Sequence, residues 1–423
     1  MVKGEELEGF IEKLVYGGAG LMRVDGCVVF VPGTAQGERV RARAAAVKKH
    51  FVQADLVTVL QPAPGRQPPD CRIRETTVPG CVYAHLTPTA ECEAKEAQLH
   101  EFLDKFGVEE WLPPVDSPAP LHYRNKLTLH AERVHEKILL GYRMEPGHDV
   151  VDLDACPLSL PPINETLALF RKSPAFQSLR NGDEVVFRLS DEGVSVFRPP
   201  RRKGYRRLPG KPQCWSPEDG MFHDGDLPVL HQTMTVGTFE VPCDGFFQVN
   251  PSMAEHLAEE VADWFAEDLE RFPEVLDLYC GVGVFALFCR AKGAVRIFGV
   301  EASGEAVEFA RRNAENFCVP GKFVRSSLGN AQRLGQNWIH NPARTTVIVD
   351  PPRGGMAANA VRAVLAGRFP KVLYVSCDPA TLARDVALFA AAGYTVRRVR
   401  LMNLFPRTAR FETLVELVKK GAV

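Results

Sequence analysis

The chain has 423 residues, of which 45% are hydrophobic and 24% are charged. This composition is typical of a soluble globular protein, and the length predicts two or three domains. No apolar run approaches the roughly 20 residues that span a bilayer, and residues 1–6 lack the apolar core of a signal peptide. We therefore expect a cytoplasmic protein without a membrane partner, whose 11 cysteines are mostly reduced.

Basic residues are concentrated in two runs, although the formal net charge is only −1. Residues 39–54 contain Arg39, Arg41 and Arg43 without an acid among them before residue 55. Residues 198–207 form the second run. Such runs can neutralise RNA phosphates, but they can equally be solvated surface. The sequence leaves both interpretations open.

Residues 1–62 consist of short apolar runs broken by glycine turns. Residues 27–31 are predicted to form one strand, and residues 39–43 a second strand with arginine on one face. Several short strands within about 60 residues favour a small closed β-barrel of the OB type, because closure removes exposed strand edges. The proline-rich stretch 61–69 predicts the end of this first domain.

Residues 63–245 read as a central α+β domain. Residues 91–103 have a helical pattern, and strand-like runs follow near 126–130, 138–143 and 184–189. The absence of regular alternation between strands and helices favours an antiparallel sheet over a parallel one.

Residues 246–423 predict an α/β fold with a Rossmann-like, doubly wound sheet. Short apolar runs at 274–278, 297–301, 346–350 and 371–376 alternate with helical stretches. Continuous apolar runs are typical of parallel strands that are buried on both faces. In such sheets, ligands bind at the carboxyl ends of the strands.

A cofactor site is predicted at three of these strand ends. The first strand leads into a glycine turn at residues 277–283, and Glu301 follows Asp277 by 24 residues. An acid near this offset commonly binds ribose hydroxyls. A dinucleotide site is the alternative, but the third glycine of its fingerprint is replaced by Ala286. Asp350, at the end of the third strand, favours S-adenosylmethionine.

The fourth strand end carries a candidate nucleophile. Cys377 follows residues 371–376 directly, and Glu412 lies near the C-terminus. A thiolate can add to carbon 6 of a uracil and so make carbon 5 nucleophilic. A carboxylate with a raised pKa can then remove the proton from carbon 5. The other cysteines are interpreted mostly as small buried side chains.

At this point the chain resembles the bacterial RNA (uracil-5-)-methyltransferases. The resemblance rests on motifs throughout the chain, of which the cysteine motif is the most specific: residues 123–126, 141–143, 246–250, 277–283, 350–353, 376–385 and 405–408.

The resemblance implies roles for individual residues. It makes Cys377 the nucleophile and Glu412 the proton acceptor, and it implies that S-adenosylmethionine is held by Gln248, Tyr279, Glu301 and Asp350. Residues 1–62 resemble the RNA-binding TRAM domain. The helix expected near residues 91–115 is implied to pack with the catalytic domain, 246–423.

Three features depart from the family pattern. Many relatives hold a [4Fe-4S] cluster on four cysteines, of which only Cys71, Cys81 and Cys156 remain near the expected positions. Val78 replaces another, so the pattern disfavours a cluster, although Cys92 is a conceivable fourth ligand. Asn403 and Arg410 replace an Asp and a His near the base, and Asp378 replaces a common Asn.

The sequence thus predicts a monomeric enzyme that methylates carbon 5 of a uridine in RNA. Ribosomal RNA is favoured over tRNA, because the TRAM domain is commoner in the ribosomal members. The alternatives are a methyltransferase for another base and an RNA-binding or chaperone protein without turnover.

Overall fold

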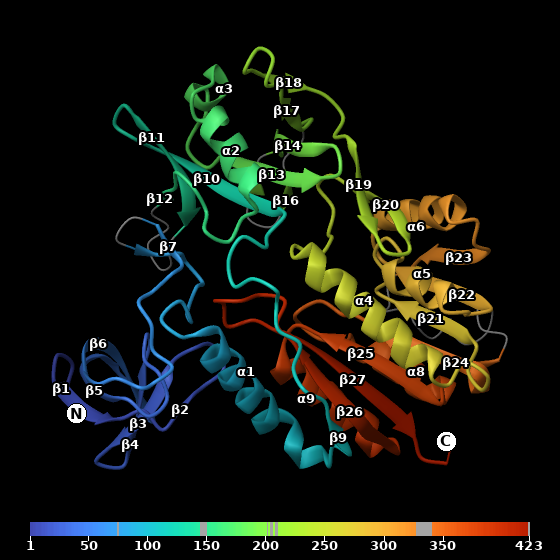
Figure 1. Cartoon of the computed structure of the whole chain (residues 1–423), viewed down its shortest axis with the longest axis horizontal. Helices are drawn as coiled ribbons and strands as arrows, with labels where there is room; N and C mark the ends of the chain where they lie inside the picture. The colour runs from blue at the N-terminus through green and yellow to red at the C-terminus, as the bar shows by residue number, and fades with distance from the viewer. Residues whose placement is uncertain are drawn as a thin grey trace.

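A computed structural model describes residues 1–73, 76–143, 150–200, 202–203, 206–207, 210–326 and 341–421. Three larger sheets of six, seven and eight strands occupy different parts of the molecule (Figure 1). In these ranges, no helix has the length and apolar character that a membrane crossing needs.

The N-terminal sheet has the order β1-β5-β6-β4-β3-β2 and is antiparallel except where β4 pairs with β6. It curls on itself, so that Gly9 of β1 packs against the Met22 side chain of β3. Its small core is closed at the bottom by Tyr83 and Leu86, which follow in the chain. The strands are β1 (Glu6–Phe10), β2 (Lys13–Leu14), β3 (Gly20–Val24), β4 (Cys27–Val31), β5 (Arg39–Val47) and β6 (Phe51–Gln61).

The middle sheet is antiparallel, with the order β12-β11-β10-β13-β14-β17-β18. Helix α2 (Pro161–Phe170) covers it, with α3 (Pro174–Gln177) beside it. Its strands are β10 (Lys126–Val134), β11 (Lys137–Arg143), β12 (Val150–Asp152), β13 (Glu184–Ser190), β14 (Gly193–Arg198), β17 (Gln213–Trp215) and β18 (Phe222–Asp224). Three hairpins accompany it: β7 (Arg72–Ile73) with β8 (Thr76–Thr77), β15 (Arg202–Lys203) with β16 (Arg206–Arg207), and β19 (Val229–Met234) with β20 (Gly237–Pro242).

The C-terminal sheet has the order β23-β22-β21-β24-β25-β27-β26-β9. Its first five strands are parallel, and β27 is antiparallel to both neighbours. The parallel strands are β21 (Glu274–Leu278), β22 (Arg296–Glu301), β23 (Gly321–Arg325), β24 (Thr345–Val349) and β25 (Lys371–Ser376). The remaining strands are β9 (Glu110–Trp111), β26 (Tyr394–Met402) and β27 (Glu412–Lys419). This is the class I methyltransferase arrangement, and it confirms the α/β, mainly parallel fold expected for this region.

Helices cover both faces of the C-terminal sheet, because successive strand side chains point to opposite sides. Val275 and Ile348 face a core formed with α4 (Pro251–Ala266), α5 (Val284–Ala291) and α6 (Gly304–Asn316). Leu276 and Val347 face the opposite core, with α8 (Ala358–Gly367) and α9 (Pro379–Ala391). Short 3-10 turns occur at Asp104–Phe106 and Pro342–Arg344.

Helix α1 (Pro88–Leu103) also packs on the C-terminal sheet, although it precedes the middle sheet in the chain. Leu99 and Leu103 belong to the same apolar core as α8 and α9. The helix is shorter than the expected 91–115, because Gly107 adopts a left-handed conformation after the 3-10 turn. The chain then forms β9, which extends the sheet beside β26. Figure 1 shows α1 between the N-terminal and C-terminal sheets.

The Arg407 guanidinium joins the end of the chain to the segment before and within α1. It donates to Glu91 Oε2 at 3.2 Å, to the Leu86 carbonyl at 2.8 Å and to Asp70 Oδ2 at 2.5 Å. Both Arg407 and Glu91 are 1% exposed. Glu91 Oε1 also accepts from Lys95 Nζ at 2.6 Å. A buried charge is costly without its partner, so this ion pair fixes the two segments together.

We predict that Arg407→Ala lowers the free energy of unfolding by about 3–5 kcal/mol, because it leaves the buried Glu91 carboxylate without its counter-ion. Urea denaturation would measure this. Arg39→Ala is the control: Arg39 is 3.5 Å from Glu8 in an exposed pair, for which a loss of at most about 1 kcal/mol is expected. Equal effects of the two substitutions would contradict the assigned role of Arg407.

Candidate active site

The carboxyl ends of β21, β22, β24 and β25 meet at one edge of the C-terminal sheet, because these strands are parallel and adjacent. Leu278 pairs with Val300 on one side and with Val349 on the other. The candidate residues that end or follow these strands therefore lie at the same edge: Tyr279, Glu301, Asp350 and Cys377. Ligands bind at this edge in open α/β sheets.

Glu412 reaches the same edge from the opposite direction. Strand β27 is antiparallel to β25, and Ser376 pairs with Thr413. Glu412 is the first residue of β27, so it lies beside Cys377. Glu412 is only 3% exposed, and its Oε2 has no hydrogen-bond partner among the described residues. Cys377 is half-buried, so its sulfur is accessible from outside.

Burial and charge shift the ionisation of this group of side chains. Burial, with the charges of Glu412 and Asp350, raises the pKa of the Cys377 thiol to about 12. Burial and Asp350 raise the pKa of Glu412 well above its usual value. Burial alone raises the pKa of Asp350 to about 7. The Arg353 charge acts in the opposite sense and lowers the pKa of both Cys377 and Glu412. The site therefore places a thiol beside a desolvated carboxyl that can exchange a proton.

The turn after β21 leaves open space beside the backbone. Tyr279, Gly281 and Gly283 all have positive φ, at 64°, 54° and 90°. A Cβ atom added to Gly281 would meet nothing within 4 Å. A non-glycine residue such as Tyr279 rarely adopts this conformation, and such strain is concentrated at functional sites. The Tyr279 hydroxyl accepts from the Ala357 amide at 3.2 Å, which fixes the side chain across the loop after β24.

The Glu301 carboxylate stands at one side of this open turn. It accepts hydrogen bonds from the backbone amides of Ala302 at 2.6 Å, Ser303 at 2.8 Å and Gly281 at 3.3 Å. A carboxylate has about four acceptor positions, so one remains for a ligand hydroxyl. The open turn and the fixed acid fit the ribose of a nucleoside such as S-adenosylmethionine.

Gln248 approaches the site from the segment before α4. The Val249 carbonyl accepts from the Asn125 amide at 2.8 Å, and Asn250 Nδ2 donates to the Leu404 carbonyl at 3.0 Å. These bonds hold the half-buried Gln248 between the middle sheet and the loop that leads to Glu412.

The candidate iron–sulfur cysteines lie elsewhere, in the core of the middle sheet. Cys71, Cys81 and Cys156 are all buried there, in the same apolar cluster as Val78. The Cys156 sulfur lies 3.0 Å from the Tyr142 hydroxyl. Cys92 is on α1, outside that cluster. Across the described ranges, no three His, Cys, Asp or Glu side chains are arranged to hold a metal ion.

The first basic run is compensated within its own sheet. Arg41 donates to Glu8 Oε1 at 2.6 Å, and Arg43 donates to Glu6 Oε1 at 2.9 Å. The cross-strand register of β1 and β5 places each arginine opposite or diagonal to a glutamate. This favours the interpretation of the run as exposed strand surface. Of the second run, residues 201, 204–205 and 208–209 lie outside the described residues.

Two contributors to this edge were not singled out by the sequence as site residues. Arg353 had a signal, since it ends the Asp350-Pro-Pro-Arg motif, and its charge acts on both Cys377 and Glu412. Tyr16 had none. Its hydroxyl lies 3.2 Å from Asp378 Oδ2, from which it is separated by 362 positions in the chain.

Comparisons with known proteins agree with this geometry. Residues 222–420 match the family model described as tRNA (Uracil-5-)-methyltransferase. The chain is 30% identical to the 23S rRNA (uracil(1939)-C(5))-methyltransferase RlmD of Halomonas elongata, over 96% of this chain and 88% of that protein. It is 29% identical to an uncharacterized RNA methyltransferase of Thermosynechococcus vestitus, with 98% of each chain covered.

The fold is similar to that of a solved structure over nearly its whole length. This is the Pyrococcus abyssi tRNA (uracil-54, C5)-methyltransferase in complex with S-adenosyl-L-homocysteine. The TM-score is 0.74 at 24% identity, with 97% of this chain and 99% of that chain covered.

We predict that Glu412→Gln stabilises the protein at neutral pH. The folded-state pKa of Glu412 is raised, so the unfolded state gains free energy by ionising as the pH rises above about 4.3, while the folded state does not. The stability of the wild type should therefore fall relative to the variant by about 1.4 kcal/mol per pH unit between the two pKa values. Thermal melting of both proteins between pH 4 and pH 8 would measure this, with equal stability expected near pH 4.

Glu416→Gln is the matched control on the same strand. Glu416 is also fully buried, but it lies 2.8 Å from Lys371 and 2.6 Å from Arg398. Loss of a buried ion-pair partner destabilises, so the opposite sign is expected. A lower melting temperature for Glu412→Gln at pH 8 would show that its carboxyl is ionised in the folded protein.

Proposed function

The chain belongs to the S-adenosylmethionine-dependent RNA (uracil-5-)-methyltransferase family, and we propose that it methylates carbon 5 of one specific uridine in RNA through a covalent bond from Cys377. It acts in the cytoplasm as a monomer. The observation that carries this proposal is the pairing of Ser376 with Thr413, which puts the Cys377 sulfur beside the desolvated Glu412 carboxyl at the ligand edge of the sheet.

In the proposed reaction, Cys377 loses its proton and its sulfur bonds to carbon 6 of the uracil ring. The electrons of the C5–C6 double bond move to give an enolate, which makes carbon 5 nucleophilic. S-adenosylmethionine supplies the methyl group that carbon 5 receives. The Glu412 carboxylate then accepts the carbon 5 proton, the double bond re-forms, and the sulfur leaves carbon 6 as a thiolate.

Arg353 supports both ionisation steps. The thiol must become a thiolate before it attacks, and Glu412 must be ionised before it accepts a proton. A nearby positive charge favours both ionised forms, which burial disfavours. Arg353 is exposed, so an approaching RNA phosphate or the uracil itself can contact it.

The proposed S-adenosylmethionine site consists of Gln248, Tyr279, Glu301 and Asp350. Glu301 binds the ribose hydroxyls with its remaining acceptor position. The open glycine turn at Gly281 admits the ligand close to the backbone. Tyr279 and Gln248 flank it, and Asp350 separates it from the uracil side of the site.

The proposed substrate is ribosomal RNA, with tRNA as the second candidate. The RlmD relative is named for 23S rRNA, and residues 1–62 act as a TRAM-like RNA-binding barrel, in the manner of the family's ribosomal members. Mapping 5-methyluridine in ribosomal and transfer RNA from cells that lack the protein distinguishes the two. A missing 5-methyluridine in 23S rRNA supports the first candidate, and one missing in tRNA supports the second. An unchanged map in both would contradict the function.

Cys377→Ala should lower the rate of methylation by at least about a thousandfold, because no other group can add to carbon 6. RNA transcribed with 5-fluorouridine should form a stable covalent complex with the wild type, since Glu412 cannot remove fluorine as a proton. Gel shift under denaturing conditions would detect it. Cys318→Ala, which removes an exposed cysteine, should leave both readouts unchanged. A covalent complex with Cys377→Ala would show that another residue is the nucleophile.

Arg353→Gln should shift the pH–rate profile of methylation to higher pH. Removal of the positive charge raises the pKa of Cys377 and of Glu412, so each ionised form appears only at higher pH. The rate measured across pH 6–10 at saturating S-adenosylmethionine checks this. A profile that falls in height without moving along the pH axis would contradict an electrostatic role for Arg353.

A further inference from the structure

Tyr16, Asp378 and Arg410 form a three-membered contact next to the nucleophile. Tyr16 Oη donates to Asp378 Oδ2 at 3.2 Å and accepts from Arg410 Nη1 at 2.5 Å. Arg410 Nη1 also donates to Asp378 Oδ2 at 3.0 Å. Tyr16 follows β2 in the N-terminal sheet, whereas the other two belong to the catalytic sheet's loops. We name this contact the clasp.

Asp378 is positioned by both of its carboxylate oxygens. Oδ1 accepts from the amides of Ala380 and Thr381, each at 3.1 Å, and so caps the first turn of α9. Oδ2 is the atom held by the clasp. The peptide between Cys377 and Asp378 therefore runs between a helix start and a fixed side chain, which restricts the direction of the Cys377 sulfur.

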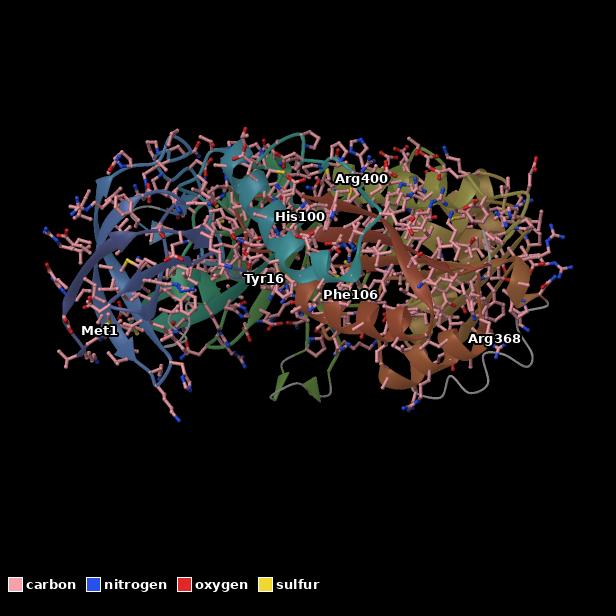
Figure 2. The ribbon with its side chains drawn as sticks, turned by 90° about the horizontal axis from the view of Figure 1, so that it is seen from below. Met1, Tyr16, His100, Phe106, Arg368 and Arg400 are labelled. Atoms are coloured by element: carbon pink, nitrogen blue, oxygen red, sulfur yellow. The ribbon has the colours of Figure 1, made fainter. Side chains whose placement is uncertain are left out.

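The path of Tyr16 to this position is determined by the turn that follows it. Gly17 and Gly18 have φ values of 105° and 94°. A Cβ on Gly18 would lie 2.5 Å from a Val82 side-chain carbon, so no larger residue fits there without a shift. The Tyr16 ring then packs edge-on against Phe102 of α1 and against Phe411. Figure 2 shows Tyr16 beside α1, where the N-terminal sheet meets the rest of the chain.

The charges of the clasp are balanced. Burial and Asp378 raise the pKa of Tyr16 to about 12, so its hydroxyl keeps the proton that it donates. Arg410 compensates the Asp378 carboxylate, which would otherwise stand as an unpaired negative charge one residue from the thiol. The Arg410 charge also lowers the pKa of Cys377, against the effect of Glu412.

We propose that the clasp is a positioning device through which the N-terminal sheet holds the Cys377 sulfur in the direction needed to attack the base. Tyr16 is thus a positioning residue for the reaction, contributed from outside the catalytic sheet. This inference rests on the proposed covalent function of Cys377. It assigns the N-terminal sheet a part in the chemical step, beyond any part in RNA binding.

The test is Tyr16→Phe, which keeps the ring packing and removes only the hydroxyl. The rate of covalent complex formation with 5-fluorouridine RNA should fall about tenfold, because the sulfur is less well oriented. The KM for S-adenosylmethionine and the melting temperature should stay close to those of the wild type. Tyr394→Phe is the matched control, since it removes a hydroxyl bonded to the Phe369 carbonyl at the far end of the sheet.

A second pair of variants tests the charge balance. Arg410→Gln leaves Asp378 unpaired, so the pH–rate profile should move to higher pH. Adding Asp378→Asn to that variant removes the negative charge while retaining a helix-capping side chain, and should move the profile back. Tyr16→Phe changes no charge, so its profile should keep its position on the pH axis.

The outcomes separate the two proposals. If the wild type forms the covalent complex and Tyr16→Phe forms it at the same rate, the clasp proposal is overturned and the proposed function stands. An equal loss of rate in Tyr394→Phe would also overturn it, by showing a general structural effect. If the wild type itself forms no complex, the proposed function fails.

Discussion

The buried ion pair between Arg407 and Glu91 is the constraint on which the site depends. It joins a loop near the end of the chain to helix α1, and neither charge can leave the other without a cost of several kcal/mol. The network continues through Lys95 Nζ, which donates to Asn403 Oδ1 at 2.7 Å and to the Phe405 carbonyl at 3.2 Å. The loop that delivers Glu412 is therefore held by a segment more than 300 positions earlier.

This network gives a physical reason for two departures from the family pattern. Asn403 Nδ2 donates to Asp116 Oδ1 at 2.7 Å, so an Asp at position 403 would face a second carboxylate. Arg410 and Asp378 contact each other directly, at 3.0 Å. An acid and a base at these positions form one matched interaction, and each makes sense only with the other. The departures therefore adapt the support of the site and leave Cys377 and Glu412 in place.

The chemistry of the site is in tension with its stability. A buried carboxyl at Glu412 and another at Asp350 disfavour their own ionised forms, which the folded protein has to accommodate. The same desolvation gives Glu412 the basicity that proton removal needs. The charges of Arg353 and Arg410 set how far Cys377 is from its reactive thiolate form. Ordered support from α1 and the N-terminal sheet keeps these side chains close despite their cost.

The sequence by itself determined the catalytic sheet and its chemistry. Residues 274–278 and 371–376 are strands with the predicted bounds, because parallel strands buried on both faces leave uninterrupted apolar runs. The strand end at Cys377 followed directly. Only the tertiary structure decided what surrounds it: that α1 and β9 join this sheet, that glutamates neutralise the arginines of β5, and that Tyr16 reaches Asp378. These are contacts between distant segments, and a contact that depends on the packing of separate sheets leaves no periodic pattern in the sequence.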